Sequence, residues 1–149
     1  MNKDAIIAVV TNAKRSHKTW VENAHSLIDG IPLDKEKVPV NSTSCKFGEW
    51  YYGDGQKLKR IPGFKEIEEQ HDALHHTYRE IFVLLFGEEE SSSFFRKLFG
   101  ISQRSSAKKL NIAKEKVGKL DKQSITIMKM LDDFGRTISS MTEEQINRY

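Results

Sequence analysis

Hydrophobic residues recur at alternating intervals of three and four in the first thirty residues of the chain. The series comprises Ile6, Val10, Ala13, His17, Trp20, Ala24 and Leu27. This spacing places all seven side chains on one face of an α-helix, and the middle member is a histidine where an apolar residue is expected. The pattern predicts an amphipathic helix that ends at Gly30 and Pro32.

The same alternation returns in two later segments. The first comprises Phe64, Ile67, His71, Leu74, Tyr78, Ile81 and Leu85 and ends at Gly87. The second comprises Leu110, Ala113, Val117, Leu120, Ser124, Ile127, Leu131, Phe134, Ile138 and Met141. Both segments are predicted to be long amphipathic helices, and the second is long enough to form a bundle or a dimer seam.

Turn-forming residues interrupt the helical pattern in two places. Between residues 33 and 62, prolines, glycines and a Ser/Thr/Asn cluster surround a short segment, 45–52. We expect this segment to be a brief helix that is N-capped by one of the Ser, Thr or Asn residues before Cys45. Residues 87–106 are expected to be a connector with a short basic, aromatic turn packed over the bundle end, the alternative being a membrane or partner contact.

These elements predict an all-α fold, because no segment alternates with the period of two that marks a strand. We expect an antiparallel helical bundle of about four main helices plus a short Cys-bearing helix. The whole is interpreted as a single domain over residues 1–145, with 87–106 as an internal connector and 146–149 as a tail.

Composition excludes several classes of protein. Hydrophobic residues make up 38% and charged residues 30% of the 149, which is typical of a globular domain. The net charge of +3 is spread along the chain, so nucleic-acid binding is not indicated. The apolar run at residues 5–10 is too short to span a membrane. Cys45 is the single cysteine, so no internal disulfide is available, and we expect a reducing, cytoplasmic location.

Several residues have side chains that suit a metal ion. His71 and His75 stand one helical turn apart and can point to one ion. Cys45 lies near a predicted helix start, which favours the thiolate form that binds metals. His17 lies on an apolar face, where a buried ring needs a partner. Taken singly, however, a buried histidine is more often a core residue, and a lone buried cysteine more often behaves as a small apolar one.

Three motifs together are more specific. His17-Lys18-Thr19-Trp20, Cys45-Lys46-Phe47-Gly48-Glu49-Trp50 and His71-Asp72-Ala73-Leu74-His75 occur in this order, and the chain resembles the chemoreceptor zinc-binding (CZB) domain family, whose signature is HxxW, CxxGxW and HxxxH. The resemblance implies a zinc ion held by His17, Cys45, His71 and His75. It also implies packing roles for the motif residues Trp20, Phe47, Gly48 and Trp50.

Other polar residues near the motifs receive weaker interpretations. His25 and His76 are expected at the surface. Asp72 is either a carboxylate that orients a ligand imidazole or a solvated helix residue. A di-iron bundle of the hemerythrin type would need more histidines and inward-facing acids than the chain supplies.

The family resemblance also implies a function. CZB domains occur in chemoreceptors, in diguanylate cyclases and as small stand-alone proteins, so we expect a cytoplasmic sensory domain that acts on such a signalling partner, as a homodimer. The signal is either zinc occupancy or oxidation of Cys45 by an oxidant such as hypochlorous acid. The alternative is a helical interaction module with purely structural zinc. Four protein ligands close the metal site, so no catalysis is expected.

Overall fold

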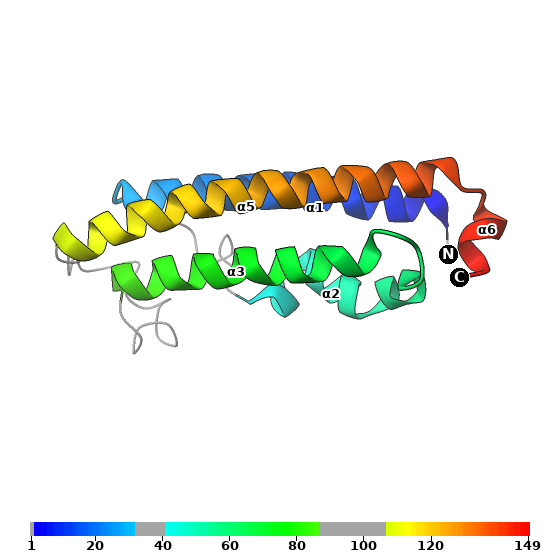
Figure 1. The fold of residues 1–149 in the computed structure, drawn as a ribbon, viewed down its shortest axis with the longest axis horizontal. Helices are drawn as coiled ribbons and strands as arrows, with labels where there is room; N and C mark the ends of the chain where they lie inside the picture. Colours follow the sequence, from blue (N-terminus) through cyan, green and yellow to red (C-terminus); the bar gives the residue numbers. More distant parts are fainter. Residues whose placement is uncertain (1, 32–40, 87–106) are drawn as a thin grey trace.

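The fold consists of three long helices and several short ones. The computed structural model describes residues 2–31, 41–86 and 107–149, and the predicted connector at 87–106 lies outside these residues. The long helices are α1 (Lys3–Ile28), α3 (Phe64–Phe86) and α5 (Ala107–Ser140) (Figure 1). The short elements are the helices α2 (Lys46–Tyr52) and α6 (Glu143–Asn147) and the 3₁₀ turns η2 (Ser42–Ser44) and η3 (Asp54–Leu58).

Helix α5 runs antiparallel to both α1 and α3 (Figure 1). Contacts along the α3–α5 pair show this direction, because Glu80 binds Lys116 and the earlier Ala73 binds the later Gln123. Both α1 and α3 pack mainly against α5 and only slightly against each other, and α2 packs on α1. The predicted all-α antiparallel bundle is therefore confirmed, with no strand among the described residues.

The predicted helical faces are the faces that the structure buries. All seven residues of the periodic series in α1 are buried, and so are all seven in α3. In α5 the buried residues are Ala113, Val117, Leu120, Ile127, Leu131, Phe134 and Ile138. Ile146 of α6 is only 2% exposed and belongs to the same core, so packing continues past residue 145.

Local capping explains where the helices begin and end. The Asn2 side chain accepts hydrogen bonds from the first-turn amides of α1. After α1 the chain turns at Gly30, whose φ of 77° is a left-handed conformation that suits glycine. The predicted N-cap of α2 is wrong: Cys45 itself occupies that position, and its Sγ accepts the Gly48 N–H in place of a Ser, Thr or Asn oxygen. None of the described helices is long and apolar enough to cross a membrane.

Candidate metal centre

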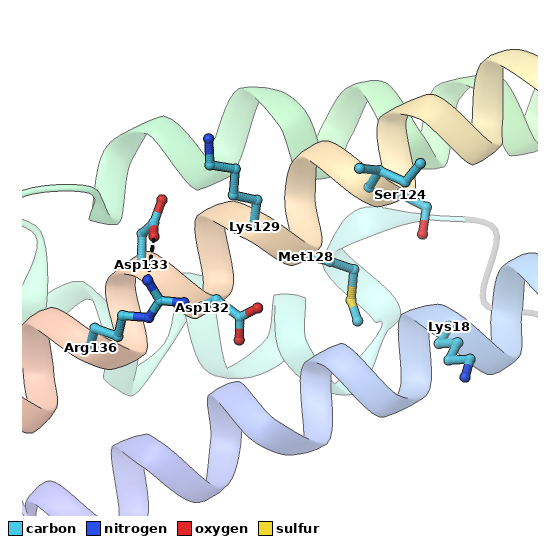
Figure 2. A pocket seen from close by; sticks show the side chains of 8 residues that line it. Lys18, Ser124, Met128, Lys129, Asp132, Asp133 and Arg136 are labelled. Carbon is cyan, nitrogen blue, oxygen red and sulfur yellow. Dashed lines mark ion pairs between the residues drawn. The ribbon is translucent and has the colours of Figure 1, made fainter.

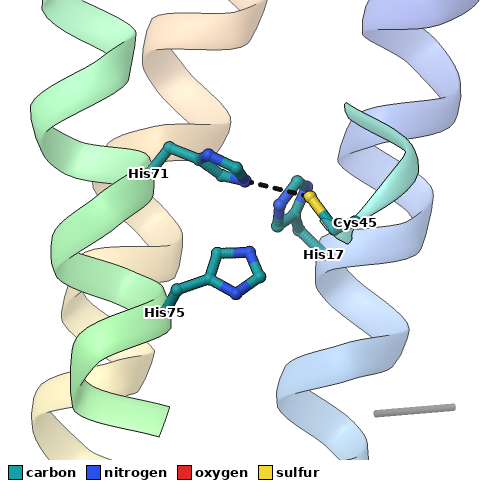
Figure 3. Close-up of side chains that lie close together, drawn as sticks. All are labelled: His17, Cys45, His71 and His75. Carbon is teal, nitrogen blue, oxygen red and sulfur yellow. Dashed lines mark hydrogen bonds between the residues drawn. The ribbon is translucent and has the colours of Figure 1, made fainter. Parts of the chain in front are cut away.

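The four side chains expected to bind zinc come together from three segments. Figure 3 shows His17 of α1, Cys45 at the start of α2, and His71 and His75 of α3 facing one another. One nitrogen or sulfur atom from each lies within 4.8 Å of all the others. All four residues are buried, with exposures of 1% to 8%.

The ring of His17 is oriented by its own helix. Its Nδ1 lies 2.7 Å from the backbone oxygen of Ala13, one turn earlier. A carbonyl oxygen only accepts hydrogen bonds, so Nδ1 carries the proton and Nε2 keeps its lone pair. A second hydrogen bond of this kind fixes the orientation of many metal-binding histidines.

The sulfur of Cys45 is held by the start of α2. Its Sγ accepts the Gly48 N–H at 3.2 Å and lies 3.3 Å from Nε2 of His71. Gly48 is needed there because a Cβ on it would lie 1.7 Å from the backbone oxygen of Ser42. Ser42 and Thr43 of η2 therefore pack directly against the glycine.

Burial keeps the imidazoles of His71 and His17 neutral. It lowers the pKa of His71 to about 2, and the neighbouring His75 and His17 add to the effect. Burial also lowers the pKa of His17, against a smaller opposing effect of the hydrogen bond to Ala13. Neutral imidazole is the form that donates a lone pair to a metal.

Burial also acts on the thiol. It raises the pKa of Cys45, and this outweighs the lowering by the amides of Gly48 and Phe47. The amides at the start of α2 therefore do not by themselves produce a thiolate, contrary to the sequence argument. A bound dication would supply the missing charge, since a coordinating thiol is deprotonated outright.

The cluster fits a zinc ion in composition and spacing. Zinc prefers four tetrahedral nitrogen and sulfur ligands at about 2.0–2.3 Å, which places neighbouring ligand atoms roughly 3.3–3.8 Å apart. The separation of 3.3 Å between Cys45 Sγ and His71 Nε2 already matches such an edge. The other ligand atoms, all within 4.8 Å, require only small side-chain adjustments. No second group of this kind exists in the described parts of the chain.

Aromatic side chains surround the cluster. Trp20 stacks on Tyr78 with ring centroids 3.8 Å apart and lies 4.5 Å from the ring of His75. Phe47 makes an edge-on contact with the ring of His71, at 5.1 Å. The motif aromatics therefore pack the imidazoles in place.

The C-terminal end of α2 is attached to α3. The rings of Tyr51 and Phe64 are stacked 4.4 Å apart, and the Tyr51 hydroxyl donates to the backbone oxygen of Phe64 at 3.1 Å. Trp50 makes an edge-on contact with the same phenylalanine. This attachment lies at the opposite end of α2 from Cys45.

The remaining polar candidates take other roles. His25 and His76 have exposed side chains, as expected, and make surface ion pairs. Asp72 accepts a hydrogen bond from the Tyr52 hydroxyl of α2 at 3.3 Å. Burial raises the pKa of that tyrosine to about 12, and the charge of Asp72 adds to the effect. This contact was not predicted from the sequence.

Two grooves border α1 on opposite sides. The α1–α2 groove, of about 480 Å³, is lined by Val9, Asn12, Ala13, Arg15, Ser16, His17, Thr19, Trp20, Asn23, Cys45, Lys46, Phe47, Trp50 and His75. It therefore reaches three of the four cluster residues. The α1–α5 groove, of about 410 Å³, is lined by charged residues of both signs and has no cluster of metal ligands (Figure 2).

Comparison with known proteins gives one match. Residues 17–82 match the family described as Chemoreceptor zinc-binding domain, a range that begins at His17 and contains all four cluster residues. No curated protein and no solved structure matches the chain.

Proposed function

Since residues 17–82 of this chain match the chemoreceptor zinc-binding domain family, we propose that it is a zinc-dependent regulatory protein. His17, Cys45, His71 and His75 hold one zinc ion, and zinc occupancy or oxidation of Cys45 changes helix packing that a signalling partner detects. The observation that carries the proposal is the convergence of four buried ligand atoms, from three segments, within 4.8 Å.

The position of the cluster in the bundle supports a regulatory role. Helices α1 and α3 pack mainly on α5 and touch each other little, so α5 joins them on one side. On the other side, the cluster connects His17 of α1 with His71 and His75 of α3. Bound zinc would therefore link two long helices that otherwise meet through α5.

The segment that responds to zinc is the start of α2. Its C-terminal end is anchored by Tyr51 and Phe64, independently of the metal. Its N-terminal end is held through Cys45, whose sulfur both caps the helix and faces His71. Loss of zinc releases this end first, while the cores of α3 and α5 remain packed.

Oxidation of Cys45 reaches the same outcome by another route. The thiolate sulfur attacks the chlorine of hypochlorous acid, forming an S–Cl bond and releasing hydroxide. Water then displaces chloride and loses a proton, which leaves a sulfenic acid; sulfur has lost two electrons and chlorine has gained them. A sulfenic acid is a poorer zinc ligand than a thiolate, so the ion leaves.

The proposal includes partners and a location. It assigns a chemoreceptor or diguanylate cyclase as the signalling partner, on the family's known contexts, and a homodimer as the working form. The dimer is tested at Ile125 of α5, a residue that is 72% exposed beside the α1–α5 groove. A cytoplasmic location suits a cysteine that must stay reduced to bind zinc. Four protein ligands complete the zinc shell, so the proposed role is not catalytic.

Matched histidine variants test the metal site. His75→Ala should weaken zinc binding by more than about 100-fold, because it removes a ligand. His76→Ala, one residue later with an exposed side chain, should bind zinc like the wild type. Elemental analysis should give about one zinc per chain, and competition with a chelator gives the affinity. Iron in place of zinc, or equal affinity in the two variants, would refute the site.

Hydrogen exchange separates a sensor from a structural staple. After zinc removal, a sensor should lose protection at amides of residues 42–50 while α3 and α5 keep theirs. A purely structural zinc predicts that all helices lose protection together. The latter result would replace the proposed function with that of a helical interaction module.

Ultracentrifugation of the wild type and of Ile125→Glu tests the proposed dimer, which the variant should weaken.

A further inference from the structure

We propose that the α1–α2 groove is the route by which small anionic thiol reagents and oxidants reach Cys45, and that Arg15 and Lys46 select for their negative charge. This inference rests on the proposed function only in taking Cys45 as the responsive residue. It adds which face of the molecule a reagent enters, and that an anionic reagent is favoured there over a neutral one of similar size.

The groove is the side on which the cluster opens. Its lining includes His17, Cys45 and His75, and its volume of about 480 Å³ is enough for a small molecule. His71, which is only 1% exposed, does not line it. A reagent in this groove therefore reaches Cys45 without contacting His71.

The charges along the groove have one sign. Arg15 and Lys46 are exposed side chains at its wall, and none of the described residues that line it is acidic. Arg15 is placed by a hydrogen bond of 2.9 Å to the side-chain oxygen of Asn12. Two cations beside an apolar wall that includes Val9 and Trp50 raise the local concentration of anions.

The α1–α5 groove provides the contrast. It also borders α1, but its charged residues are of both signs: Asp132 and Asp133 of α5 lie in the same lining as Lys18, Lys129 and Arg136 (Figure 2). It contains no residue of the cluster. Lys18→Glu is therefore a control: it changes the net charge and the stability of α1 as Arg15→Glu does, but it lies outside the proposed route.

Thiol probes of different charge test the inference, since Cys45 is the single cysteine of the chain. In each reaction the Cys45 sulfur forms a mixed disulfide and releases one coloured thiolate or thione. The rate for the dianion 5,5′-dithiobis(2-nitrobenzoate) should fall about tenfold in Arg15→Glu, while that for neutral 4,4′-dithiodipyridine stays within about twofold. Lys18→Glu should change neither rate. In 1 M salt, where the Debye length is about 3 Å, the effect of Arg15→Glu should disappear.

A size test is independent of charge. Ser16 is an exposed residue of α1 that lines the groove, so Ser16→Trp should slow both probes by about tenfold or more. Thr11→Trp adds the same bulk at an exposed position of α1 outside the groove and should slow neither. Equal rates in Ser16→Trp and wild type would overturn the route, and equal slowing of both probes by Arg15→Glu would overturn the charge selection.

The measurement separates this inference from the proposed function. The rates are measured on the metal-free full chain, so they do not depend on zinc affinity. If His75→Ala binds zinc normally, the proposed zinc site fails while the groove result stands. If Ser16→Trp reacts like the wild type, the route fails while zinc affinity is unaffected.

Discussion

Gly48→Ala is the sharpest test of how α2 is built. The added Cβ would lie 1.7 Å from the Ser42 oxygen and 2.8 Å from its carbonyl carbon, and both are backbone atoms. Real Cβ atoms essentially never approach within 3.0 Å, so η2 must move by more than an ångström. Overpacking of this kind costs about 1–3 kcal/mol, against the roughly 1 kcal/mol that alanine gains over glycine inside a helix, so Gly48→Ala should destabilise the protein by up to about 2 kcal/mol.

The displacement should also reach the metal site. The Gly48 amide is a donor to Cys45 Sγ, and η2 immediately precedes that cysteine. Changes in groups that orient a metal ligand typically cost 10- to 100-fold in affinity. We therefore expect Gly48→Ala to bind zinc about 10- to 100-fold more weakly than wild type.

Gly118→Ala is the matched control. Gly118 lies inside α5, and a Cβ there meets nothing within 4 Å among the described residues. The same substitution should therefore stabilise the protein by about 0.5–1 kcal/mol and leave zinc affinity unchanged. Urea unfolding followed by circular dichroism, with zinc affinity from chelator competition, checks both variants. If Gly48→Ala is as stable and binds zinc as tightly as Gly118→Ala, the close approach of Ser42 is refuted.

Four further predictions follow from other contacts. In a Trp50→Phe background, zinc should change the fluorescence of Trp20, which lies 4.5 Å from the His75 ring; an unchanged spectrum would contradict the placement of zinc there. Thr77→Val should stabilise the protein by about 1 kcal/mol in urea unfolding, because the buried Thr77 hydroxyl has no hydrogen-bond partner among the described residues. Chelation of zinc should lower the melting temperature, since zinc at about 1,000 times its Kd adds about 4 kcal/mol; an unchanged value would show that zinc does not bind the native state preferentially. The hydrogen bond to Lys116 lowers the pKa of Glu80 in the folded protein, so the pair adds a few tenths of a kcal/mol to the free energy of unfolding. This contribution is present above pH 4.5 and is lost as the pH falls through the lower pKa of the folded state. Lys116→Met should remove that part of the pH dependence, as measured by urea unfolding at several pH values.

The helices and their buried faces were predictable because the signal is local. Intervals of three and four express the helical period directly, and the structure buries the residues so identified in α1 and α3. The hydrogen bond between His17 and the Ala13 carbonyl joins residues four apart, which is also the spacing of one helical turn. The convergence of His17, Cys45 and the His71 and His75 pair depended on recognising three motifs together.

Features that depend on packing between segments were not predictable from the pattern. The N-cap of α2 was assigned to a Ser, Thr or Asn because oxygen is the usual capping acceptor, whereas the backbone places the Cys45 sulfur in that position. The α1–α2 groove exists because two helices that are separate in the sequence lie side by side. The contact of Tyr52 with Asp72 likewise joins α2 to α3 across the fold.

The double use of one sulfur atom has a thermodynamic consequence. Helix α2 has seven residues, well below the roughly 12–15 that an isolated helix needs to persist in water. Its existence thus depends on its two ends, and the Cys45 sulfur is the cap of one of them. Chemical change at that single atom would remove the cap of α2 and one of the four proposed zinc ligands together. On the proposed function, the expected response is a helix-to-coil transition of α2, and the length and helix propensity of α2 would set the threshold of that response.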